Sequence, residues 1–171
     1  MDYVFDHIFR LVSKYKNKGL LIDTNLLLVY FIGSYDRRRL STFKRTIKYS
    51  LDDYAIITTF VEHFRVLVTT PHILTEVGNL SNALPDEFKE NYYQEFKKQV
   101  TVLNEIYEPS IKICDCECFG RLGLTDSCIT LLSKGKYLVF TDDLPLSSHL
   151  RSLNVDVLNL NHIKSKSWLS D

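Results

Sequence analysis

Four acidic residues that lie far apart in the chain could act together as one site: Asp23, Glu76, Asp126 and Asp143. Carboxylate oxygens are hard ligands, and they suit Mg²⁺ or Mn²⁺. Several carboxylates in one cleft repel one another, and a bound divalent cation relieves that repulsion. Such an ion can activate a water molecule and stabilise charge on a phosphoryl group. These residue types therefore indicate a metal site that hydrolyses phosphodiester bonds.

Three acidic residues follow short apolar runs that are typical of buried strands. Residues 20–22 and 137–140 lack polar alternation, as strands do when both faces of a parallel sheet are covered. Asp23 follows the first run, and Asp142 and Asp143 follow the second. Ligands of an open parallel sheet bind beyond the carboxyl ends of its strands. We therefore expect these acids at one edge, with Glu76 and Asp126 facing it from the first turns of helices.

The rest of the chain alternates between helical and strand patterns. Helices are expected over residues 3–14, 25–32, 38–64 with a break near Ser50, 71–80, 86–107, 125–132 and 144–153, and further strands over 65–69, 111–114 and 155–158. This alternation predicts an α/β fold, a three-layer α/β/α sandwich with a central, mainly parallel sheet. Since 45% of the 171 residues are hydrophobic, we expect a single domain over residues 1–171.

The net charge of the chain and the absence of targeting signals from its sequence bear on its binding partners and its location in the cell. Lys plus Arg and Asp plus Glu each number 21, so the chain lacks the basic balance of many nucleic-acid-binding proteins. A local basic patch would still attract phosphates. No apolar run approaches the ~20 residues of a membrane span, and the N-terminal segment lacks the apolar core of a secretory signal. We therefore expect a cytoplasmic protein with reduced thiols and no membrane partner.

Each acid also has a purely structural explanation when it is taken alone. An Asp that ends a strand often forms a turn or caps the next helix. Asp142 and Asp143, which stand before Leu144 and Pro145, could simply begin a helix in this way. Acids early in a helix are also favoured by the helix dipole. Only the joint placement of the acids at one sheet edge favours a shared metal site.

Four short segments carry a resemblance to a known family: 21–25 (LIDTN), 71–77 (PHILTEV), 122–127 (LGLTDS) and 138–143 (LVFTDD). Together they resemble the acidic motifs of PIN domains, a family of metal-dependent ribonucleases. No single motif is specific, but their order and spacing agree over roughly residues 19–160. The resemblance implies a three-layer α/β/α fold and Mg²⁺- or Mn²⁺-dependent endonucleolytic cleavage of RNA. Many bacterial members are toxins that pair with an antitoxin protein.

The resemblance also implies roles for individual residues. Asp23 is expected to bind the metal directly, and Glu76 and Asp126 to complete the catalytic site. Asp143 matches the fourth acid of the family better than Asp142 does. Two polar neighbours of the first acid are expected to position water or phosphate: Thr24 and Asn25. Whether an antitoxin partner or a homodimer exists is left open by the sequence.

The chain departs from compact toxin-type members in the separation of Asp23 from Glu76. The extra length falls in residues 33–64, which we expect to form a helical insertion. This difference bears on the toxin role more than on the nuclease activity. The insertion carries basic side chains that could bind RNA phosphates, although a solvated helix face is the preferred interpretation. These side chains are Arg37, Arg38, Arg39, Lys44 and Arg45.

Three cysteines, Cys114, Cys116 and Cys118, stand at alternate positions, and Cys128 follows them. On a strand, this spacing would place the three thiols on the same face. Structural zinc usually uses pairs of ligands two to four residues apart. We therefore interpret these cysteines as buried or free thiols rather than as a zinc site.

Two other classes of function compete with a ribonuclease. The first is a catalytically inactive PIN-like module that binds RNA or a protein. The second is another α/β fold with acidic strand ends, such as a phosphatase or a phospho-acceptor domain. A haloacid-type phosphatase needs Asp-x-Asp after the first strand, and Asp23 is followed here by Thr24 and Asn25. Because no Walker loop or dinucleotide fingerprint occurs, a nucleotide-cofactor function is disfavoured.

Overall fold

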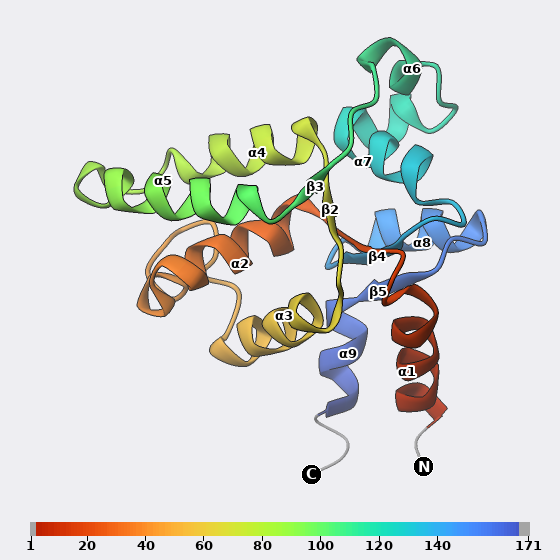
Figure 1. Ribbon diagram of the computed structural model, residues 1–171, viewed down its shortest axis with the longest axis horizontal. Coiled ribbons are helices and arrows are strands. Elements are labelled where there is room, and N and C mark those ends of the chain that lie inside the picture. Colours follow the sequence, from red (N-terminus) through yellow and green to blue (C-terminus); the bar gives the residue numbers. More distant parts are fainter. Residues whose placement is uncertain (1–2, 168–171) are drawn as a thin grey trace.

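The computed structural model describes residues 3–167, with side chains described for residues 6–165. A central sheet of five parallel strands runs through the described part in the order β3-β2-β1-β4-β5 (Figure 1). The strands are β1 (Leu20–Ile22), β2 (Leu67–Thr69), β3 (Asn104–Glu105), β4 (Leu138–Thr141) and β5 (Val157–Asn159). The predicted α/β class and parallel sheet are therefore confirmed.

The two strands that end in acidic residues are neighbours at the centre of the sheet. Leu20 of β1 pairs with Leu138 of β4, and Ile22 pairs with Phe140. Both strands are fully buried, as their unbroken apolar runs predict. Because all strands are parallel, their carboxyl ends meet at one edge of the sheet.

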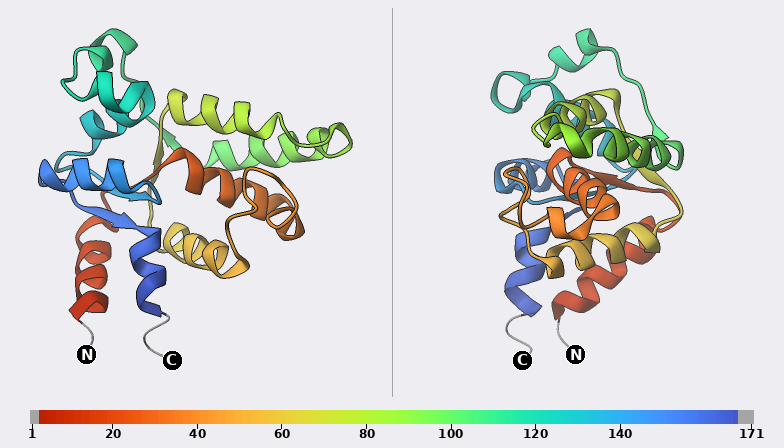
Figure 2. Two further views of the ribbon diagram at one scale, coloured as in Figure 1. Left: turned by 180° about the vertical axis from the view of Figure 1, so that it is seen from behind. Right: turned by 90° about the vertical axis from the view of Figure 1, so that its left-hand side faces the viewer.

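Helices lie on both sides of this sheet, as a three-layer sandwich requires. In Figures 1 and 2, α1, α3 and α9 lie beyond one side, and α4, α5 and α7 lie beyond the other. The helices are α1 (Tyr3–Tyr15), α2 (Thr24–Tyr35), α3 (Leu51–His63), α4 (Pro71–Ser81), α5 (Asp86–Thr101), α6 (Ser110–Cys114), α7 (Phe119–Ser133), α8 (Leu144–Ser152) and α9 (Leu160–Ser167), with a short 3₁₀ helix η1 (Arg37–Arg39). None of the described helices is long and apolar enough to cross a membrane.

Two predicted elements around residue 105 are wrong. The helix expected over 86–107 ends at Thr101, and residues 104–105 form strand β3 beside Val68 and Thr69 of β2. The strand expected over 111–114 is helix α6, which begins after Pro109, where the fixed φ of proline suits a helix start. At residues 104–105, pairing with β2 outweighs the helical periodicity that predicted a continued helix.

The segment between α2 and α3 is also less helical than expected. Apart from η1, residues 40–49 form successive turns rather than a helix. Leu40, Phe43, Thr46 and Tyr49 are buried, so every third side chain faces the core. The predicted break near Ser50 is confirmed, because Ser50 caps α3 in a capping box with Asp53. The final helix, α9, was not predicted.

Candidate functional site

The first acid, Asp23, lies directly beyond β1 and is almost fully buried, with 4% of its surface exposed. One carboxylate oxygen caps α2 by accepting from the Leu26 N–H at 3.0 Å. The other accepts a short hydrogen bond from the Thr141 hydroxyl. The register of the sheet explains this contact, because Ile22 pairs with Phe140 and the next residues along both strands then face each other.

The acids that follow β4, Asp142 and Asp143, have different surroundings. Asp143 caps α8 through the Leu146 N–H at 2.7 Å, so the expected structural role is present for one of its oxygens. Asp142 accepts hydrogen bonds from Asn25 at 3.2 Å and from the Tyr49 hydroxyl at 2.7 Å, and the Lys48 ammonium lies 2.9 Å away. Asp142 is therefore ion-paired and anchored, whereas Asp143 has no described basic partner.

Glu76 lies on α4 with both carboxylate oxygens held by threonine hydroxyls. Thr24 donates to one oxygen at 2.9 Å, and Thr125 donates to the other at 2.7 Å. These donors come from α2 and α7, so Glu76 joins three helices at the edge of the sheet. Thr24 and Asn25, which were expected to position water or phosphate, both donate to carboxylates in this structure.

Asp126 reaches the same edge from helix α7, which bends near its middle. Gly123 has φ 76° and ψ −174° there, a backbone conformation that few other residues adopt. The bend separates the first turn from the part that carries Thr125 and Asp126. The helix predicted over 125–132 begins earlier, at Phe119, so Thr125 lies within α7, and its hydroxyl binds Glu76.

Burial and neighbouring carboxylates together raise the pKa of two of these acids. Burial, then the charge of Asp142 and that of Asp126, raises the pKa of Asp23 to about 7. Burial, then the charges of Asp143 and Glu76, raises the pKa of Asp126 to about 6. No Lys, Arg or His among the described side chains forms an ion pair with Asp23, Glu76, Asp126 or Asp143.

The donor chemistry of this edge fits a divalent cation, although the side chains are not gathered around one point. All the acidic donors are hard oxygens, and a cation would relieve the repulsion that, after burial, raises the pKa of Asp23 and of Asp126. Among the described side chains, no three Asp, Glu, His or Cys residues converge closely enough to hold one ion. An ion would therefore need the carboxylates to move toward one another.

Three of the five basic residues considered for RNA binding have partners of their own. Arg37 lies 5.4 Å from the Tyr54 ring, and Arg38 binds Asp36. The Arg39 guanidinium lies 3.6 Å from the centre of the Phe88 ring. Lys44 and Arg45, by contrast, are exposed on the turns that lead to Lys48.

Sequence reasoning missed several residues that support the acids. Thr141 and Thr125 are threonines beside predicted acids, and their closeness in sequence was the only available signal. Asn159 donates to the Asp143 carbonyl at 3.3 Å, and Asn161 donates to the Asp142 carbonyl at 2.9 Å. These two asparagines hold the backbone after β4, and nothing in the local sequence of residues 159–161 indicates that role.

None of the hydrogen bonds described for the four cysteines involves one of the acidic side chains. Cys114 is exposed, Cys116 is half-buried, and Cys118 and Cys128 are buried; all four are free thiols. Because residues 110–114 are helical, the predicted strand that would have placed alternate thiols on one face is not present. Cys118 donates to the hydroxyl of Ser127, the residue after Asp126, at 3.5 Å.

Comparison with family models, with curated proteins and with solved structures finds no match to this chain.

Proposed function

We propose that the chain is a Mg²⁺- or Mn²⁺-dependent endoribonuclease of PIN type, with its active site at the carboxyl edge of the sheet. One observation carries the proposal: four carboxylates without described basic partners lie at this edge, where burial and then the charges of neighbouring carboxylates raise the pKa of Asp23 and of Asp126. A divalent cation is the simplest partner for such a set.

Asp23, Glu76, Asp126 and Asp143 would hold the metal. When bound, the ion supplies Lewis-acid activation of water and stabilisation of the phosphoryl charge. The rest of the chain's contribution is positioning. Thr24 and Thr125 orient Glu76, and Thr141 fixes the rotamer of Asp23. Such supporting hydrogen bonds commonly tune the metal affinity of the carboxylates they hold.

The turns before α3 offer a surface for the phosphates of RNA. Lys44 and Arg45 are exposed, and the Lys48 side chain, 60% exposed, extends to Asp142 beside the acids. An RNA backbone that binds along these basic side chains would reach the acidic edge, because Lys48 and Asp142 are in direct contact. The stacked and paired guanidiniums of Arg37, Arg38 and Arg39 are less suited to this role.

The test is cleavage of single-stranded RNA by the full-length protein with Mn²⁺. We expect wild type to cut and leave a 5′-phosphate and a 3′-hydroxyl, and Asp126→Asn to lose the activity while keeping its circular dichroism spectrum. Asp115→Asn is the matched control, because Asp115 is exposed beyond α6 and contacts none of the four acids. Cleavage that survives unchanged in Asp126→Asn and in Asp23→Asn would exclude this site.

A second candidate function is a PIN-like module that binds RNA or a protein without cutting. The observation that favours it is the lack of three converging ligands among the described side chains. RNA binding that needs neither Mn²⁺ nor Asp126, with no cleavage, would support it. A toxin role in the cytoplasm would further require a cognate antitoxin that inhibits cleavage when it is co-purified with the protein.

A further inference from the structure

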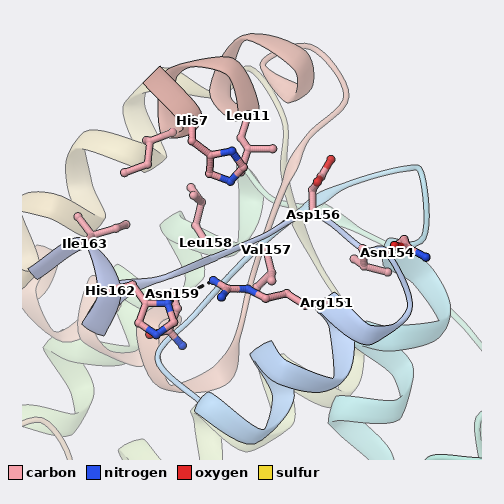
Figure 3. Close-up of a pocket in the computed structure, with 12 residues that line it drawn as sticks. His7, Leu11, Arg151, Asn154, Asp156, Val157, Leu158, Asn159, His162 and Ile163 are labelled. Atoms are coloured by element: carbon pink, nitrogen blue, oxygen red, sulfur yellow. Dashed lines mark hydrogen bonds between the residues drawn. The ribbon is translucent and has the colours of Figure 1, made fainter. Parts of the chain in front are cut away.

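A groove with a volume of about 650 Å³ runs along β5 (Figure 3). Its lining includes six consecutive residues, 154–159. Successive side chains of a strand point to opposite faces of a sheet. A pocket on one face would therefore touch alternate residues, whereas this groove follows the edge of the strand.

The sheet order leaves that edge of β5 without a described neighbour. β5 pairs only with β4 among the described strands, with Val139 opposite Val157. The Val139 N–H donates to the carbonyl of Asp156. By the alternation of a parallel ladder, the backbone groups of Val157 then point to the free edge. Such an edge is a template for another strand.

The walls of the groove are apolar, and its rim is basic. Ile8 and Leu11 come from α1 and Ile163 comes from α9, two helices that lie side by side in Figures 1 and 2. Figure 3 shows Arg151 reaching along the groove toward His162, to which it donates at 3.2 Å.

The other ionisable side chains in the lining, Asp156 and His7, do not balance the positive charge of Arg151. Asp156 is the one carboxylate in the lining, and it is occupied by Lys14 at 2.6 Å and by the Tyr15 hydroxyl at 2.9 Å. Arg151 forms no ion pair among the described side chains. His7 adds a further titratable base to the lining. The rim is therefore complementary to a negatively charged occupant.

We infer that this groove binds an extended segment of a partner protein, which adds as a strand to the free edge of β5 and places an acidic side chain against Arg151. Main-chain hydrogen bonds along an edge strand and pockets for alternate side chains are how such peptides are recognised. A second copy of this chain is disfavoured, because pairing of two β5 edges would bring the basic rims of both copies together.

The inference is tested by selecting binders from a displayed library of random twelve-residue peptides on the full-length protein. The enriched peptides are expected to alternate apolar and polar residues and to carry at least one Asp or Glu. Their binding, measured by fluorescence anisotropy, should weaken by about tenfold or more in Arg151→Glu. Lys97→Glu on α5, an exposed charge reversal distant in the fold, should bind as wild type does.

A second measurement distinguishes strand addition from attachment to the rim alone. Bound peptide should slow hydrogen exchange at the Val157 amide, and a peptide with N-methylated backbone positions should bind much more weakly. Failure to enrich any peptide, equal binding by Arg151→Glu, or unchanged exchange at Val157 would each overturn the inference. Sedimentation of the free protein as a dimer that Arg151→Glu dissociates would overturn it in favour of a second copy.

Discussion

The hydroxyl of Thr141, at the end of β4, donates to the buried carboxylate of Asp23, which directly follows β1. The same Thr141 oxygen accepts from the Asp143 N–H at 2.9 Å. One threonine thus joins the first and the last acid of the proposed site. It also fixes the carboxylate of Asp23 where the charges of Asp142 and Asp126 act on it. The two hydrogen bonds of Thr141 thus connect the ends of β1 and β4, the central strands that position the acidic edge.

Burial of Asp23 should make the protein less stable as the pH rises. The native state keeps a proton on Asp23 up to about pH 7, whereas the unfolded chain releases it near the ordinary value of 3.8. The free energy of unfolding therefore falls between about pH 4 and pH 7. Asp23→Asn should raise it at pH 8 by something on the order of 3 kcal/mol, because asparagine also caps helices and carries no charge.

The measurement is urea unfolding at a series of pH values in the presence of a chelator. The plot of the free energy of unfolding against pH should be flatter for Asp23→Asn than for wild type. Asp126 should account for the slope that remains below about pH 6. A variant less stable than wild type at pH 8 would show that the carboxylate of Asp23 is not destabilising in the folded state.

Loss of the Thr125 hydroxyl should impair the activity without unfolding the protein. Thr125→Val keeps the shape of the side chain but frees one oxygen of Glu76. Removal of a hydrogen bond that orients a metal ligand typically lowers activity or metal affinity by about 10- to 100-fold. Thr130→Val is the matched control, because Thr130 donates only to the backbone carbonyl of Asp126. Equal activities of the two variants in steady-state RNA cleavage would contradict the role given to Thr125.

Two of the three side chains that contact the Asp142 carboxylate, Tyr49 and Lys48, should contribute unequally to stability. Tyr49 is buried, with 7% of its surface exposed, and its hydroxyl binds the carboxylate directly. Tyr49→Phe should therefore cost about 1 to 3 kcal/mol in chemical denaturation. Lys48→Met should cost less than about 1 kcal/mol, because the lysine side chain is largely exposed and the ion pair is screened. The reverse order would mean that the ion pair, not the tyrosine, anchors Asp142.

The sheet was predictable from sequence because its strands carry the strongest pattern in the chain. Leu20–Ile22 and residues 137–140 are uninterrupted apolar runs, and such runs have few alternatives to a buried parallel strand. Strand β3 lacked that signal. It is two exposed polar residues long, and only its pairing with β2 defines it.

The acids of the proposed site were predictable, but their supports were not. Asp23 directly follows β1, and Asp143 is the second residue after β4, so the topology alone brings them to one edge. Lys48 and Tyr49 reach Asp142 across 94 and 93 residues of sequence, respectively. The contacts of Lys48 and Tyr49 with Asp142 depend on the turns of residues 40–49. Every third side chain is buried there, and this spacing is easily taken for that of a helix.

The most direct test is Mn²⁺ binding measured by electron paramagnetic resonance at about pH 8, above the raised pKa values of Asp23 and Asp126. With wild-type protein in excess, the six-line signal of free Mn²⁺ is predicted to decrease sharply. It should decrease equally with Asp115→Asn and remain nearly complete with Asp126→Asn. A full signal of free Mn²⁺ in the presence of wild-type protein, or an equal loss of signal with Asp126→Asn, would contradict a shared cation at this edge of the sheet.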